Sequence, residues 1–150
     1  MFEKILFPTD FSDVSKKALA FIMTMGEAGV KEVVVLRVID QQRTELTHGI
    51  SWAGKDEIEF FDRIRKQMEQ EATEELKPIK SKLRAAGFAV KLRVESGVPK
   101  LKILEVEKQE DVAAIVLGSH GRSNVAEMLL GSVSEHVIRH CKKPVIVVKR

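Results

Sequence analysis

The sequence predicts an α/β fold in which helices cover both faces of an open parallel β-sheet. A length of 150 residues fits one domain of ordinary size, and a composition of 44% hydrophobic and 31% charged residues is typical of a globular chain. Five short apolar runs rich in β-branched residues alternate with segments of helical periodicity. Such alternation predicts strands that pair in parallel through crossover helices and are buried on both faces.

The first strand and helix lie near the N-terminus. The apolar run 5–7 predicts the strand, and Ser12 is a favoured N-cap residue for the helix that follows. Asp13 suits the positive end of that helix. The expected apolar stripe of the helix consists of Val14, Ala18, Phe21 and Met25.

Two further strands, expected over 33–39 and 90–94, flank the longest helical pattern. This helix is expected over 56–86, and Pro78 inside it should kink or split it, because proline lacks the backbone donor that a helix needs. The apolar side of the helix is expected to consist of Ile58, Phe61, Met68, Ala72, Leu76, Ile79 and Leu83.

The segment between Asp40 and Lys55 shows neither helical nor strand periodicity. A connection of this length in a compact domain is more often functional than idle, and it leaves the carboxyl end of the second strand, where ligands bind in such sheets. Trp52 lies within it between two glycines. We expect this side chain either to respond to a bound ligand or to pack on the long helix.

The C-terminal part is expected to contain a helix from near Pro99 to Glu110, a strand over 112–117, a further helix, and a last strand over Val145–Val148. The last strand carries no charge, whereas Lys91 and Arg93 interrupt the third strand. If these strands form the two edges of the sheet, the uncharged one invites pairing with a second copy. A homodimer through Val145–Val148 is therefore expected.

A glycine-rich segment follows the fourth strand. Gly118 and Gly121 come first, and Gly131 follows after nine further residues. Glycines that lead a parallel strand into a helix present unpaired backbone N–H groups to phosphate. Ser132 and Glu135 have the spacing of a capping box, which predicts a helix start directly behind Gly131. Ordinary turns and a helix cap are the alternative explanation for these glycines.

The segment from Gly118 to Ser134 resembles the ATP-binding signature of the universal stress protein family. Residues 5–12 and 143–148 resemble the first strand with its turn and the last strand of that family, so the resemblance covers the whole chain. It implies a single domain over 1–150 of the Rossmann-like, adenine nucleotide alpha hydrolase-like type. It also implies the strand order 3-2-1-4-5, with ATP across the carboxyl ends of strands one and four.

The reversal of strand order would bring Asp10 beside Gly118 and create a ligand crevice there. Asp10 would accept a hydrogen bond from a ribose hydroxyl or, alternatively, form the turn before the helix. The resemblance implies that Pro8, Thr9 and Val38 line the adenosine pocket. It further implies phosphate contacts from His120, Gly121, Arg122, Gly131, Ser132, Val133 and Ser134. The predicted ligand is ATP, with Mg²⁺ or Mn²⁺ carried by its phosphates.

Other binding and catalytic classes fit the sequence less well. His136 and His140 lie four residues apart beside Cys141, but the glutamate of an HExxH motif is missing, so no metal site is expected. The chain has no Gly-x-Ser-x-Gly elbow and no P-loop, which disfavours a triad hydrolase and a P-loop NTPase. Basic and acidic residues nearly balance, at 25 against 22, and tyrosine is absent. No nucleic-acid surface is therefore expected.

The function that the sequence favours is an ATP-binding regulatory or stress-response module with an unknown protein partner. An ATPase or phosphotransferase that uses His120 and Arg122 is the first alternative, and a nucleotide-independent interaction module is the second. A single cysteine, the lack of a membrane-spanning apolar run and a start without signal-peptide character indicate a cytoplasmic protein without a membrane partner.

Overall fold

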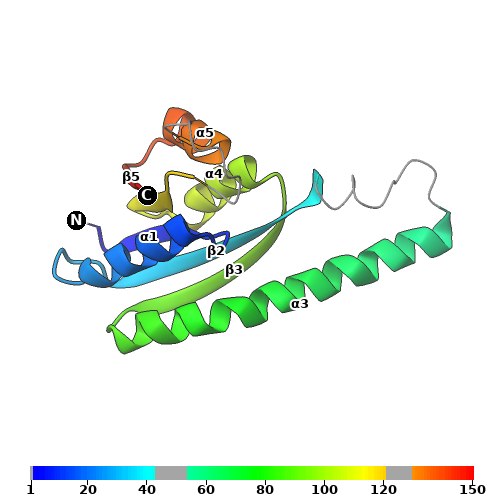
Figure 1. Cartoon of the computed structure of the whole chain (residues 1–150), viewed down its shortest axis with the longest axis horizontal. Coiled ribbons are helices and arrows are strands. Elements are labelled where there is room, and N and C mark those ends of the chain that lie inside the picture. The colour runs from blue at the N-terminus through cyan, green and yellow to red at the C-terminus, as the bar shows by residue number, and fades with distance from the viewer. Residues whose placement is uncertain (1, 43–53, 121–129) are drawn as a thin grey trace.

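The computed structural model describes residues 2–42, 54–120 and 130–150. Strands and helices alternate along these ranges (Figure 1). In chain order they are β1 (Lys4–Pro8), α1 (Asp13–Thr24), β2 (Glu32–Asp40), α3 (Lys55–Ala85), β3 (Ala89–Gly97), α4 (Pro99–Glu110), β4 (Ala114–Gly118), α5 (Ser132–His140) and β5 (Val145–Val148). No helix in the described ranges is long and apolar enough to cross a membrane.

The five strands form one sheet of order β3-β2-β1-β4-β5, and each pair of neighbours is parallel. β1 lies at the centre, where Leu6 is opposite Val34 of β2 and Ile115 of β4. β3 and β5 form the two edges. The predicted fold class, the strand order and the parallel pairing are confirmed.

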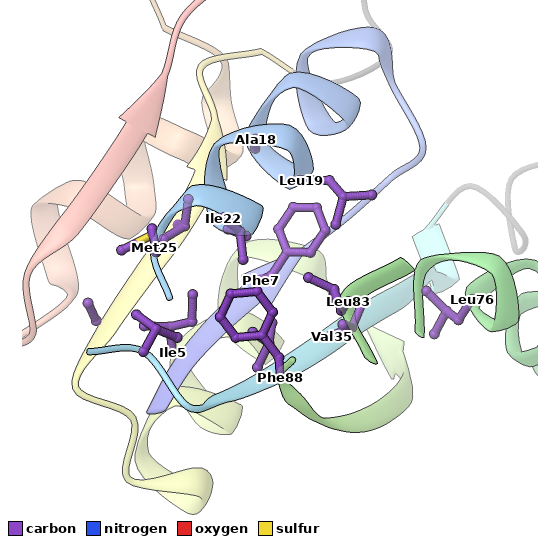
Figure 2. Close-up of a cluster of buried hydrophobic side chains, with 14 residues drawn as sticks. Ile5, Phe7, Ala18, Leu19, Ile22, Met25, Val35, Leu76, Leu83 and Phe88 are labelled. Atoms are coloured by element: carbon purple, nitrogen blue, oxygen red, sulfur yellow. The ribbon is translucent and has the colours of Figure 1, made fainter. Parts of the chain in front are cut away.

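Alternate residues of the central strand face two separate cores. Ile5 and Phe7 point to the face of the sheet that α1 and α3 cover, and Figure 2 shows them packed with Ile22 and Leu83 of those helices. Leu6 points to the opposite face, where it packs in a second cluster with Val106 of α4. All six side chains are fully buried, so both layers of helices are held by apolar burial.

Pro78 does not split α3, which runs without interruption from Lys55 to Ala85, so the predicted split is wrong. A kink at Pro78 stays a prediction. Proline removes the hydrogen bond to the carbonyl of Glu74, but both residues are exposed, and water can satisfy that carbonyl. Leu76 and Leu83 are fully buried on either side of Pro78 and hold both parts of the helix against the sheet.

The N-terminal half of α3 extends past the ends of the strands (Figure 1). The predicted apolar side of the helix is therefore buried only from Ala72 onward, and Ile58 remains 60% exposed. On α1 the predicted stripe is wrong at Phe21, which is 41% exposed, because Leu19 and Ile22 take the buried positions.

A buried carboxylate ties α4 to the sheet beside the β3 edge. Glu110, whose side chain is 6% exposed, accepts from Lys91 Nζ at 2.8 Å, Arg93 Nη1 at 3.0 Å and Lys4 Nζ at 3.1 Å. The hydrogen bond from Lys91, with those from Lys4 and Arg93, lowers the pKa of Glu110 from 4.5 to about 2, against the opposing effect of burial. The charged residues of β3 therefore bind α4 to the sheet, besides opposing the pairing of this edge with another strand.

Glu110→Gln should lower the free energy of unfolding at pH 7 by about 2 kcal/mol, because the three cations lose their carboxylate. The folded pKa lies below the unfolded one, so this stabilisation is complete above about pH 4.5 and is lost as the pH falls toward 2. Urea denaturation at a series of pH values measures the difference. Glu3→Gln, which removes an exposed ion pair with Lys31, is the matched control and should change little. A Glu110→Gln effect that is independent of pH would contradict this account.

Candidate functional site

A pocket of about 660 Å³ opens at the carboxyl ends of β1, β2 and β4. This is the place in an open α/β sheet where strand order reverses and ligands bind. The pocket brings together every predicted site residue that the structure describes, namely Pro8, Thr9, Asp10, Val38, Gly118, His120, Gly131, Ser132, Val133 and Ser134. Gly121 and Arg122 lie outside the described residues.

Pro8 ends the hydrogen-bonded ladder between β1 and β4. β1 is paired with β4 only at Ile5 and Leu6, whereas its pairing with β2 continues to Pro8. The next N–H, that of Thr9, donates to the carbonyl of Leu36 in β2 at 2.9 Å. Successive N–H groups of a strand point to opposite sides, so the donor that proline lacks is the one that would face β4. The two strands separate there, and the crevice begins.

Asp10 forms the turn between β1 and α1. Its Oδ1 accepts from the backbone N–H of Ser12 at 3.0 Å, which is an Asx turn. Ser12 caps α1 in turn, because its Oγ accepts from the N–H of Ser15 at 3.2 Å. The predicted N-cap and the turn-forming interpretation of Asp10 are thus seen in the structure. A contact between Asp10 and a ribose stays a prediction.

Phe11 adopts a φ of 62°, a left-handed conformation that few residues other than glycine tolerate. Its N–H donates to Thr9 Oγ1 at 3.2 Å, and the Arg37 guanidinium lies 5.2 Å from the centre of its ring. Thr9 Oγ1 also lies 2.6 Å from the buried hydroxyl of Ser15. The contacts of Thr9, of Ser15 in α1 and of Arg37 in β2 therefore hold the strained turn in place.

Gly118 allows α1 to approach the end of β4. A Cβ at this position would lie 2.7 Å from Val14 Cγ1 and 3.3 Å from the backbone carbonyl carbon of Val14. The sequence suggested that this glycine keeps the way to the phosphates clear. The structure shows a second requirement, because the first turn of α1 occupies the space that a side chain would need.

α5 begins directly behind Gly131, as predicted, but without a capping box. Gly131 itself is the N-cap residue, Ser132 is the first helical residue, and no side chain caps the helix. The Gly131 N–H donates to the carbonyl of Ser119 at 2.7 Å, which fixes the helix start beside the end of β4. The N–H groups of Ser132, Val133 and Ser134 belong to the first turn, which has no intrahelical acceptors. These three residues line the pocket.

Two buried serine hydroxyls hold the end of β4. Ser134 Oγ of α5 donates to the carbonyl of Gly118 at 2.8 Å. Ser119 Oγ lies 2.7 Å from Nδ1 of His120, a residue that lines the pocket. The helix start, the strand end and the imidazole are thus fixed relative to one another.

Part of the pocket lining was not predicted from the sequence. Met68, Glu71, Ala72 and Glu75 of α3 line the pocket together with residues of α4 and with Arg37 and Asp40 of β2. The four α3 residues are spaced three and four apart in the sequence, as residues on one face of a helix are. No sequence feature, however, fixes which part of a 31-residue helix passes the end of the sheet. These residues add the carboxylates of Glu71, Glu75 and Asp40 to a pocket that also holds the start of α5.

The predicted loop between Asp40 and Lys55 is shorter at both ends than expected, because Asp40 ends β2 and Lys55 begins α3. A strand or a helix ends where its regular backbone hydrogen bonds end, and the sequence pattern marks such ends only approximately. Residues 43–53, including Trp52, lie outside the described part of the chain. The prediction for Trp52 therefore stays a prediction.

His136 and His140 stack on one another at the surface of α5, with ring centroids 4.1 Å apart. Nδ1 of His140 is hydrogen-bonded to the carbonyl of His136 at 2.9 Å. Desolvation lowers the pKa of His136, and the neighbouring His140 lowers it further. Among the described residues, no three His, Cys, Asp or Glu side chains are placed to hold a metal ion.

The chain matches the Universal stress protein family over residues 1–149. It belongs to that family. Universal stress protein MJ0577 of Methanocaldococcus jannaschii is 37% identical over 156 residues, which cover 100% of this chain and 96% of that protein. Universal stress protein YxiE of Bacillus subtilis is 32% identical over 149 residues, which cover 99% of this chain and 100% of that protein. The resemblance found in the sequence is thus confirmed.

Solved structures place the fold in the same family. The structure of MJ0577 matches with a TM-score of 0.88 and covers 100% of this chain and 97% of its own. A universal stress protein of Archaeoglobus fulgidus in complex with dAMP matches with a TM-score of 0.63 at 23% identity, over 99% of this chain and 98% of its own. At that identity the likeness concerns the fold.

Gly118→Ala should destabilise this universal stress protein by about 1–3 kcal/mol, because the added methyl group overpacks the contact between α1 and β4. Urea denaturation measures the loss. Gly54→Ala is the matched control, since a Cβ there meets nothing within 4 Å. Equal stability of Gly118→Ala and the wild type would show that α1 can move away without cost.

Proposed function

We propose that this universal stress protein binds ATP in the pocket at the carboxyl ends of β1 and β4, and acts as a nucleotide-dependent regulatory or stress-response module. One observation chiefly supports this proposal. The predicted residues come from separate segments of the chain, and they line one pocket of about 660 Å³. A volume of this size is ordinary for a site that binds a small organic ligand.

The two sides of the pocket suit the two ends of a nucleotide. Pro8, Thr9 and Val38 would line an adenosine, to which Pro8 and Val38 offer apolar groups, beside the carboxylate of Asp10. The first turn of α5 offers backbone donors and the positive end of a helix to the phosphates. Mg²⁺ or Mn²⁺ would be carried by the phosphates, as a hard cation that prefers oxygen ligands.

The family comparisons support an adenine nucleotide as the ligand class. The Archaeoglobus fulgidus protein was solved in complex with dAMP, and it shares the fold described above. ATP, with three phosphates, is the choice that the glycine-rich signature favours. Steady-state turnover of Mg-ATP by the purified protein separates a binding module from an ATPase or phosphotransferase.

ATP at 100 times its Kd should raise the melting temperature by about 5–10 °C, which corresponds to about 2.7 kcal/mol. Gly131→Val should abolish most of this shift, because a branched side chain at the helix start obstructs the approach of phosphate. The Gly131 φ of −72° is accessible to valine, so the variant should fold. Differential scanning fluorimetry with and without Mg-ATP measures both shifts.

Gly54→Val is the matched control, because Gly54 is also the N-cap of a helix at a φ of −72° but lies outside the pocket. It should keep the wild-type shift. A wild type that does not respond to ATP would refute the proposed function. A folded Gly131→Val that keeps the full response would refute the phosphate position only.

The proposal includes a homodimer through β5. Val145–Val148 is an outer strand of the sheet, all four of its residues are only half-buried, and it carries no charge. An antiparallel two-fold pairing of this edge would satisfy its open backbone groups and leave no new edge.

Ile146→Lys should shift the protein from dimer to monomer at micromolar concentration, because a charge on the central part of β5 opposes pairing. Sedimentation velocity distinguishes the two species. Leu101→Lys, at a 53% exposed position of α4, places the same charge on another apolar surface and should leave the dimer intact. A monomeric wild type, or an unchanged dimer in Ile146→Lys, would refute this interface.

A further inference from the structure

Ser119 places a fully buried hydroxyl next to the pocket. The residue follows β4, and its backbone is held on two sides. Its N–H donates to the carbonyl of Val148 in β5 at 2.8 Å, and its carbonyl accepts from the Gly131 N–H at 2.7 Å. The position of Ser119 Oγ is therefore fixed by β5 and by the start of α5.

The hydroxyl of Ser119 is hydrogen-bonded to one nitrogen of His120. Oγ lies 2.7 Å from Nδ1, the one partner of this hydroxyl in the described part of the chain. A buried hydroxyl hydrogen needs an acceptor, and Nδ1 accepts only when it carries no hydrogen itself. In the neutral imidazole the ring hydrogen then lies on Nε2.

The second buried serine at this site has a different task. Ser134 Oγ donates to the carbonyl of Gly118 at 2.8 Å, so its hydrogen already has an acceptor and it joins α5 to β4. Ser119 is thus the hydroxyl that sets the hydrogen position on His120. The contact joins adjacent residues of a chain segment held by two backbone hydrogen bonds, which keeps its geometry constant.

We infer that Ser119 is a positioning residue that holds His120 in the Nε2–H tautomer, so that the imidazole offers a donor to an anionic group in the pocket. Phosphate oxygens accept hydrogen bonds, and a donor is favourable where a nitrogen lone pair would repel them. The inference rests on the proposed nucleotide binding for its ligand, but the tautomer can be measured without one.

The first experiment is ¹⁵N NMR of the histidine side chains in the unliganded protein at alkaline pH. The chain has four histidines, and His120→Gln identifies the signals of His120 by their disappearance. The wild type should show the hydrogen of His120 on Nε2, and Ser119→Ala should shift the ring toward a mixture of tautomers. The inference would be overturned if the ring hydrogen of His120 lay on Nδ1 in the wild type, or if Ser119→Ala left the tautomer unchanged.

The second experiment compares ATP with adenosine by isothermal titration calorimetry. Ser119→Ala should weaken ATP binding about tenfold and leave adenosine binding unchanged, because only the phosphates use the Nε2–H donor. An equal loss for both ligands would mean that Ser119 merely shapes the strand end. Ser96→Ala removes a serine hydroxyl at the end of β3 that does not line the pocket, and it should affect neither ligand.

A double-mutant cycle isolates the coupling between the two residues. In His120→Gln the amide supplies a donor whose position does not depend on a tautomer, so Ser119→Ala should cost no further ATP affinity in that background. A full tenfold loss there would overturn the inference. A wild type that binds neither ligand would refute the proposed function, and the NMR result would still decide the tautomer.

Discussion

The end of the β1–β4 ladder at Pro8 is the constraint on which the site depends. While two parallel strands remain paired, no ligand can pass between their ends. The proline removes the donor on the β4 side, so β1 continues along β2 alone, and the chain turns into α1 through Asp10 and the strained Phe11. Near the same point α1 passes close to β4, where Gly118 has no room for a side chain.

The residues around this crevice divide the work between side chains and backbone. Hydroxyl groups of Thr9, Ser12, Ser15 and Ser134 are engaged in holding turns and helix starts in place. The first turn of α5 lies at the same pocket, which is also lined by the imidazole of His120, the guanidinium of Arg37 and carboxylates of β2 and α3. An anion site of this kind needs little net charge from the protein, which is consistent with a chain whose basic and acidic residues nearly balance.

The sequence predicts those features that depend on local pattern. Apolar runs mark the strands, Ser12 marks the start of α1, and the glycine-rich segment, through its family resemblance, marks the pocket residues. Features that depend on which segments meet in space could not be predicted. The carboxylate of Glu110 looks like one charge among many in α4, and only the packing of α4 against β1 and β3 places three cations around it. The α3 wall of the pocket and the exposure of Ile58 both follow from where the helix crosses the sheet, which periodicity does not encode.

The part of α3 that extends beyond the strands should tolerate changes of length that the rest of the helix does not. From Ala72 onward the helix is bound to the first core, and a change of length there would rotate every buried side chain by 100° per residue. Ahead of Ala72 the helix has no buried residue that fixes its rotation relative to the sheet. Ahead of Met68, which lines the pocket, whole turns could be added or removed without disturbing the sheet, and a reporter group or an affinity tag could be inserted at low cost. The helix thus offers an engineering site within reach of the pocket but outside the core.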